Sequence, residues 1–158
     1  MNSEQVARHF DLSGKVILVT GGSRGLGFEM SRAFAQAGAT TVISSRKQAG
    51  CDEAAAAIRE ETGQESLPLA CHVGDWDDCD RLVEACYARF GRVDVLVNNA
   101  GMSPVYDSLS SISRELWDKV IAVNLAGPFR LAAVVGERML QGEGGAIINV
   151  SSTAAVIP

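Results

Sequence analysis

Two adjacent serines close the segment INVSS at residues 148–152. A serine just beyond the end of a buried strand is well placed to hold the oxygen of a carbonyl or hydroxyl group. Catalysis rarely relies on a serine alone, so this pair raises the question of which other residues share its site.

A glycine-rich stretch, VTGGSRGLG at residues 19–27, lies between an apolar run and an amphipathic one. Its Gly21, Gly25 and Gly27 have the spacing TGxxxGxG. Glycines permit a tight turn and a close approach of backbone to a pyrophosphate, and the free amides of a helix N-terminus favour an anion. The stretch predicts a dinucleotide-binding loop, and a turn without a ligand is the alternative.

The end of the second apolar run reads SSRK, at residues 44–47. Dinucleotide-binding folds often place an acidic residue here to hold the adenosine ribose hydroxyls. In this chain Ser45 takes that place, Arg46 follows it, and Arg24 of the glycine loop is expected to point to the same spot. Two guanidiniums without a carboxylate suit a 2′-phosphate, so we expect NADP(H) rather than NAD(H). The alternative is that both arginines are solvated surface charges.

The elements that must position these residues alternate along the chain. Unbroken apolar runs are typical of strands covered on both faces, as in parallel sheets. We expect strands over 15–20, 40–45, 66–71, 93–99 and 145–152, and helices over 28–38, 51–63, 75–91 and 114–141. This alternation predicts an α/β fold with a doubly wound parallel sheet in a single domain, 1–158. Pro128 predicts a kink near 124–128.

Composition narrows the class of protein. The chain has 158 residues, with 47% hydrophobic and 21% charged residues and a net charge of −5. An acidic balance argues against nucleic acid and anionic membranes as partners, and the apolar runs are too short for a membrane helix. The four cysteines form no CxxC pair and neither histidine has ligand spacing, so we expect reduced, partly buried thiols and no metal site. The polar first stretch, residues 1–15, has no apolar core of signal-peptide length, so we expect a cytoplasmic protein.

Four segments together resemble the short-chain dehydrogenase/reductase family: TGGSRGLG (20–27), NNAG (98–101), VNLAG (123–127) and INVSS (148–152). They occur in the family's order and at its spacing. The resemblance implies a Rossmann-like sheet of strand order 3-2-1-4-5, which continues with two further strands in the family. It also implies an oxidoreductase that transfers a hydride between NADP(H) and a ketone or alcohol substrate.

The resemblance implies cofactor contacts residue by residue. The phosphates and the phosphorylated ribose are expected to be lined by Gly21, Ser23, Arg24, Gly25, Leu26 and Gly27. The remaining cofactor contacts are expected from Ser45 and Arg46 at the 2′ position, His72 and Val73 beside the adenine, Asn99, Ala100 and Gly101 at the middle, and Val123 near the nicotinamide. The family usually has an aspartate where His72 stands, so this chain departs from the family at the polar contact to the adenine.

The resemblance also assigns catalytic residues. Ser152, rather than Ser151, matches the serine that holds the substrate oxygen, and Asn124 matches an asparagine that helps to hold a water in a proton relay. The family's proton-donating tyrosine, followed four residues later by a lysine, has no counterpart up to Pro158. We therefore expect both residues beyond Pro158 and little activity from this chain alone.

Two expectations about the whole protein remain. Family members pack through the long helix, so 114–141 is the expected face of a homodimer or homotetramer. A non-catalytic nucleotide-binding or scaffold protein of the same fold is the alternative function. Five strands alone leave 145–152 as an apolar, unpaired edge.

Overall fold

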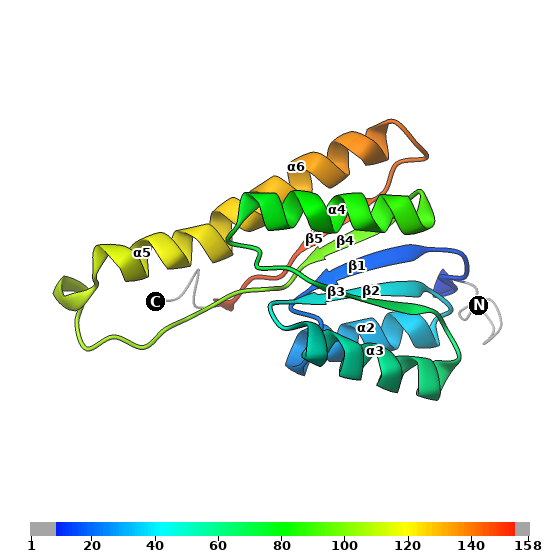
Figure 1. The fold of residues 1–158 in the computed structure, drawn as a ribbon, viewed down its shortest axis with the longest axis horizontal. Coiled ribbons are helices and arrows are strands. Elements are labelled where there is room, and N and C mark those ends of the chain that lie inside the picture. The colour runs from blue at the N-terminus through cyan, green and yellow to red at the C-terminus, as the bar shows by residue number, and fades with distance from the viewer. Residues whose placement is uncertain (1–8, 154–158) are drawn as a thin grey trace.

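A computed structural model describes residues 9–153 of the chain, and helices cover both faces of its parallel sheet (Figure 1). The strands are β1 (Val16–Thr20), β2 (Thr40–Ser45), β3 (Ser66–Ala70), β4 (Val95–Asn98) and β5 (Ala146–Asn149). The helices are α2 (Gly25–Gln36), α3 (Gln48–Thr62), α4 (Trp76–Phe90), α5 (Arg114–Ile121) and α6 (Gly127–Leu140), with short η1 (Leu109–Ser111) and η2 (Ala122–Ala126). The strand order is β3-β2-β1-β4-β5, which confirms the doubly wound sheet predicted from the sequence.

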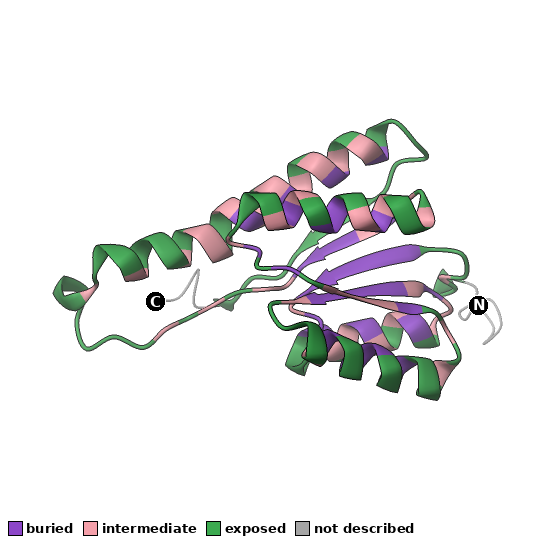
Figure 2. Cartoon of the chain, in the orientation of Figure 1, coloured by how far each residue is buried: buried purple, intermediate pink, exposed green. Residues whose placement is uncertain are grey.

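Strand β1 lies at the centre of the sheet and is buried along its whole length (Figure 2). It pairs in parallel with β2 on one side and with β4 on the other. Helices α2 and α3 cover one face of the sheet, and α4 and α6 cover the other (Figure 1). Because both faces are covered, the apolar run of β1 needs no polar alternation. The carboxyl ends of all five strands meet at one edge of the sheet, here called the carboxyl edge.

The long helical segment is continuous from Arg114 to Leu140 but contains one irregular turn. Residues Ala122–Ala126 form a π-helical turn, in which the Gly127 amide donates to the Ala122 carbonyl instead of the carbonyl four residues back. Pro128 lies two residues after this turn and has no N–H to donate to the Asn124 carbonyl. The disturbance predicted near 124–128 is therefore present as a π-helical turn, a feature that is frequent at functional sites.

The two outermost strands of the sheet, β3 and β5, differ in how their unpaired sides are protected. On β3, Pro68 removes one backbone donor, and the Gln48 side chain contacts the Ala70 amide (2.8 Å) and the Pro68 carbonyl (3.2 Å). On β5, all four residues are exposed, and its one partner among the described strands is β4 (Figure 2). Ile147 and Ile148 are 37% and 44% exposed. The expected apolar edge is thus present within the described part of the chain.

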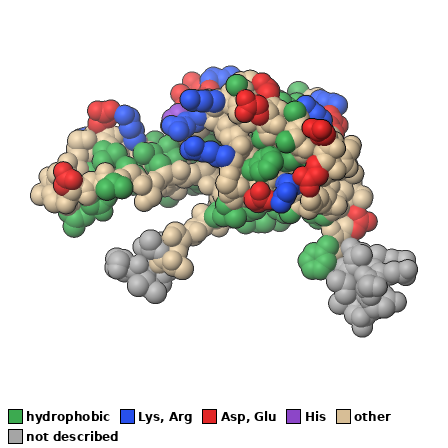
Figure 3. Space-filling view, turned by 90° about the horizontal axis from the view of Figure 1, so that it is seen from below, with side chains coloured by type: hydrophobic (Ala, Val, Ile, Leu, Met, Phe, Trp, Pro, Cys, Tyr) green, Lys and Arg blue, Asp and Glu red, His purple; other side chains and the backbone are tan. Residues whose placement is uncertain are grey.

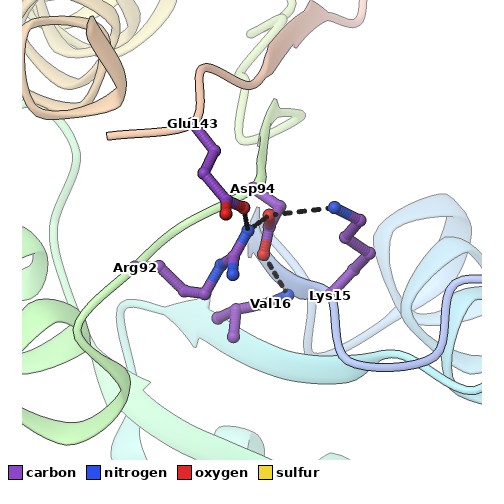
Figure 4. A network of polar contacts seen from close by, with 5 residues as sticks. All are labelled: Lys15, Val16, Arg92, Asp94 and Glu143. Atoms are coloured by element: carbon purple, nitrogen blue, oxygen red, sulfur yellow. Dashed lines mark hydrogen bonds and ion pairs between the residues drawn. The ribbon is translucent and has the colours of Figure 1, made fainter. Parts of the chain in front are cut away.

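A charged network joins the amino ends of β1 and β4 (Figure 4). The buried Asp94 carboxylate accepts a hydrogen bond from the Val16 amide at 2.8 Å and pairs with Arg92 and, at 3.4 Å, with Lys15. Arg92 also pairs with Glu143 at 3.0 Å. Burial alone raises the pKa of Asp94, but the bonds from Arg92 and Val16, together with the positive charges of Arg92 and Lys15, outweigh burial, and the net pKa lies below its usual value.

An apolar stripe remains exposed along the long helix. It consists of Trp117, Ile121, Leu125 and Phe129, which follow one another at four-residue spacing. Hydrophobic side chains are visible along the arm that contains α5 in Figure 3. Contrary to the expectation from the sequence, the helical segment Arg114–Leu140 is, by length and composition alone, long and apolar enough to cross a membrane. In this fold, however, Leu131, Val135 and Met139 of the same helix are buried in the core.

Candidate functional site

The glycine loop joins β1 to α2 at the carboxyl edge. Gly25 begins α2 at φ +56°, and a side chain added there would meet open space. A Cβ added to Gly27 would lie 2.2 Å from the Gly21 carbonyl oxygen, so this position tolerates only glycine. The loop therefore brings the backbone close together at Gly21 and Gly27 and leaves it accessible at Gly25.

The N-terminus of α2 has the properties of an anion site. Its N-cap residue, Arg24, makes no side-chain capping bond, and its first turn contains no acidic residue. By contrast, the N-termini of α4 and α5 are capped by the side chains of Asp75 and Ser113. The first amides of α2 thus lack the side-chain cap that would compete with a phosphate.

Asn99, directly after β4, holds the glycine loop in place. Its side-chain amide donates to the Thr20 carbonyl (2.9 Å) and the Gly21 carbonyl (3.3 Å). In return, the Thr20 hydroxyl accepts bonds from the Asn99 and Ala100 amides, each at 3.1 Å. Asn99 and Ala100 were predicted to support the cofactor, and the structure brings them against the loop. Thr20 was not predicted, because a threonine at a strand end gives no sign of a partner 79 residues away.

The carboxyl end of β2 lies beside the same loop. The Gly22 amide donates to the Ser44 carbonyl at 3.0 Å. A Cβ added to Gly50 in α3 would lie 3.7 Å from the Ser23 hydroxyl. Ser23 and the Ser45–Arg46 pair, which were predicted to surround the phosphorylated ribose, are thus brought to one side of the carboxyl edge.

Three exposed cations belong to this region: Arg24, Arg46 and Lys47. Within residues 9–153, none of the three pairs with a carboxylate, whereas bases elsewhere, such as Arg32, Arg92 and Arg130, each do. Lys47 is also the N-cap of α3 and makes no side-chain capping bond there. Uncompensated positive charge beside two uncapped helix N-termini is suited to a phosphate. Lys47 was missed in the sequence, although it directly follows Arg46.

The loop after β3 carries His72 and Val73. The His72 amide donates to the Asp78 carboxylate at 3.0 Å, and this bond is the main reason why the pKa of Asp78 lies below its usual value. The His72 side chain is exposed at the carboxyl edge, whereas the Val73 side chain is buried in the core. Of the two residues predicted beside the adenine, His72 is therefore the one whose side chain is presented to solvent.

The π-helical turn carries Val123 and Asn124. The Asn124 side chain accepts from the Met102 amide at 2.9 Å and donates to the Met102 carbonyl at 2.8 Å. A Cβ added to Gly101 would lie 3.6 Å from the Asn124 side-chain oxygen, and Val123 packs against the core. Asn124 thus fixes the segment that follows Gly101, a role that spacing alone did not reveal.

Ser151 and Ser152 follow β5 at the carboxyl edge and are exposed. The Val150 amide donates to the Asn98 carbonyl at 2.9 Å, and the Asn98 side chain donates to Asn149 at 3.0 Å. These bonds fix the end of β5 beside the end of β4. Ser152 is therefore presented at the same edge as Asn99 and the glycine loop.

Comparison with known proteins agrees with this geometry. Residues 15–158 match the short chain dehydrogenase family. The chain belongs to this family. It is 41% identical over 158 residues to dehydrogenase/reductase SDR family member 4 of Bos taurus and 39% identical to the human SDR family member 2, mitochondrial. Each comparison covers 100% of this chain and 56% of the relative, so the chain spans little more than half of their length.

Solved structures show the same fold with cofactors bound. A metagenomic short-chain oxidoreductase in complex with NADP is 35% identical, with a TM-score of 0.86 over 90% of this chain and 64% of that one. The L-sorbose reductase of Gluconobacter frateurii, complexed with NADPH and L-sorbose, is 33% identical, with a TM-score of 0.88 over 94% of this chain and 56% of that one. Membership of the family and its Rossmann-like fold are therefore established for this chain.

Proposed function

We propose that this short-chain dehydrogenase is an NADP(H)-dependent oxidoreductase that interconverts a carbonyl compound and an alcohol. The observation that supports NADP(H) is the group of uncompensated cations Arg24, Arg46 and Lys47 beside Ser45. A ribose without a phosphate is best held by a carboxylate, and none stands at the end of β2. The relatives that are complexed with NADP and NADPH support the same choice.

The residues at the carboxyl edge fit such a cofactor. The open face of Gly25 and the uncapped amides of α2 suit the pyrophosphate, and the three cations suit the 2′-phosphate. Leu26, 61% exposed at the start of α2, offers an apolar surface beside the pyrophosphate. When bound, the nicotinamide supplies or accepts the hydride.

The protein's part in the reaction is to hold the substrate oxygen and to move a proton. We assign the first task to the Ser152 hydroxyl, which donates a hydrogen bond to that oxygen. Asn124 fixes the backbone at Met102 and belongs to the π-helical turn, where we place the relay water. A tyrosine assisted by a lysine, both expected beyond Pro158, completes the proton transfer.

The assembly of the protein is proposed from an exposed apolar surface of the long helix. The exposed stripe Trp117, Ile121, Leu125 and Phe129 is proposed as the face of a homodimer or homotetramer, because exposed apolar patches mark contact surfaces. Neither a membrane nor a nucleic acid is proposed as a partner. Location in the cytoplasm stays a prediction.

The function is tested on the protein expressed from its complete reading frame, by following NADPH oxidation with a panel of ketones. We expect Ser152→Ala to lower kcat/KM by about 100-fold or more. The matched control is Ser151→Ala, which removes the neighbouring hydroxyl and is expected to retain most activity. Tight NADPH binding without turnover on any ketone or alcohol would favour the non-catalytic alternative instead.

A further inference from the structure

Cys51 contacts the residue that stands at the proposed 2′-phosphate site. Its sulfur lies 3.1 Å from the hydroxyl oxygen of Ser45, at the carboxyl end of β2. Cys51 belongs to the first turn of α3 and is fully buried, whereas Ser45 is partly exposed. The thiol is therefore positioned behind the hydroxyl, on the protein side.

The hydrogen-bond partners of this pair are few. The thiol has one proton, for which there are three acceptors: the Ser45 hydroxyl oxygen at 3.1 Å and, at longer distances, the carbonyl oxygens of Ser45 (3.8 Å) and Leu69 (3.7 Å). Within residues 9–153, the sulfur of Cys51 is the one hydrogen-bond partner of the Ser45 hydroxyl. The direction of this bond therefore decides whether Ser45 has a proton to offer outward.

We propose that Cys51 is a positioning residue that adds to the preference for NADP(H) over NAD(H) by orienting the Ser45 hydroxyl. The thiol donates to the Ser45 oxygen, and the Ser45 hydroxyl then donates outward to the 2′-phosphate. A phosphate accepts hydrogen bonds only, so an outward-pointing proton is required, and hydrogen bonds in a chain strengthen one another. This inference rests on the proposed use of NADP(H).

The chain offers a control for the loss of a buried thiol. Cys86 in α4 is as fully buried as Cys51 but lies on the opposite face of the sheet. Removing its thiol creates a similar cavity without touching Ser45. If Cys51→Ala changes the cofactor preference and Cys86→Ala does not, the change is specific to Cys51 and is not a general effect of core packing.

The experiment measures the Kd values of NADP⁺ and NAD⁺ by calorimetry for wild type, Cys51→Ala, Cys51→Ser and Cys86→Ala. We expect Cys51→Ala to raise the Kd of NADP⁺ by about five-fold, which corresponds to the loss of one hydrogen bond. The Kd of NAD⁺ should be unchanged. Cys51→Ser keeps a donor and is expected to retain more of the preference than Cys51→Ala. In a Ser45→Ala background, Cys51→Ala should have no further effect on NADP⁺ binding.

The outcomes separate this inference from the proposed function. One outcome is that wild type binds NADP⁺ more tightly than NAD⁺ while Cys51→Ala weakens the binding of both cofactors equally or of neither. In that case the role proposed for Cys51 is contradicted and the proposed function stands. If wild type does not prefer NADP⁺, both are wrong. Should Cys51→Ala fail to fold, Cys51→Val fills the cavity, lacks the donor and is expected to give the same selective loss.

Discussion

Asn124 and Met102 are joined by two hydrogen bonds: the Met102 amide donates to the Asn124 side-chain oxygen (2.9 Å), and the Asn124 side-chain nitrogen donates to the Met102 carbonyl (2.8 Å). A single side chain thus satisfies both backbone polar groups of a residue 22 positions earlier. The clamp ties the segment after β4 to the π-helical turn, and so connects the cofactor end of the site to the long helix.

Replacing Asn124 tests the clamp. Asn124→Ala removes both bonds, and we expect a loss of about 1 kcal/mol in the free energy of unfolding, because the site is exposed and water replaces the lost partners. Amide hydrogen exchange at Met102 should become faster. Asn124→Asp keeps the acceptor for the Met102 amide and should fall between wild type and Asn124→Ala. Unchanged exchange at Met102 in Asn124→Ala would show that the clamp does not order this segment.

Two glycines on α6 predict opposite effects of the same substitution. A Cβ at Gly127 would lie 2.0 Å from the Val73 carbonyl oxygen, whereas a Cβ at Gly136 would lie 3.6 Å from the nearest atom of Ile147. We expect Gly127→Ala to destabilise the fold by about 2 kcal/mol through overpacking. Gly136→Ala should stabilise it by about 0.5–1 kcal/mol, because alanine is the better helix former. Urea unfolding of the two variants checks both signs, and equal effects would contradict the close packing of α6 on the loop after β3.

The Asp94 network predicts a loss of stability in acid. The pKa of Asp94 in the fold lies below its ordinary value of 3.8. Its contribution is therefore fully present above pH about 4 and is lost as the pH falls through the folded pKa. At pH 7, Asp94→Asn should lower the free energy of unfolding by about 1–2 kcal/mol, because it removes the charge that the Val16 amide and Arg92 contact, while Arg92 keeps Glu143. Urea unfolding measures the free energy of unfolding of wild type and Asp94→Asn, and the difference between the two values should shrink as the pH falls below 4.

Glu143 is the control for this network, since it is 81% exposed and contacts the same Arg92. Glu143→Gln should change the free energy of unfolding by less than about 1 kcal/mol at any pH. An effect of Asp94→Asn no larger than that of Glu143→Gln would show that Asp94 does not hold β1 and β4 together.

The exposed stripe on the long helix predicts the oligomeric state. Leu125→Glu places a charge in the middle of the stripe and should dissociate the proposed homo-oligomer, as measured by sedimentation at micromolar concentration. Leu140→Glu changes a more exposed leucine at the end of α6 and should leave the assembly intact. If wild type is a monomer, or if Leu125→Glu sediments like wild type, the stripe is not the interface.

The order of elements and strands was predictable from the sequence because each depends on local patterns. The unbroken run of β1, the glycines that follow α3 and α4, and Asp75 before α4 all determine structure within a few residues. The glycine loop was predictable for the same reason. The irregular turn at 122–126 was predicted only as a kink, because Pro128 signals a lost hydrogen bond but not how the helix adapts to it.

The parts of the site that escaped prediction depend on contacts between distant residues. Thr20 with Asn99, and Asn124 with Met102, meet only after the sheet and the long helix have formed. Cys51 was expected to be a reduced, partly buried thiol, and it is fully buried, but its contact with Ser45 depends on how α3 packs on β2. Lys47 showed no pattern of its own, and only the absence of a carboxylate partner within the described residues drew attention to it.

The most direct test of the account is the affinity of the protein, expressed from its complete reading frame, for NADP⁺ and NAD⁺, measured by calorimetry in wild type and Arg46→Ala. Arg32→Ala is the control, because this exposed arginine pairs with Glu29 away from the site. We expect wild type to bind NADP⁺ at least about ten-fold more tightly than NAD⁺, and Arg46→Ala, but not Arg32→Ala, to remove most of that difference. Equal or tighter binding of NAD⁺ by wild type would contradict the account.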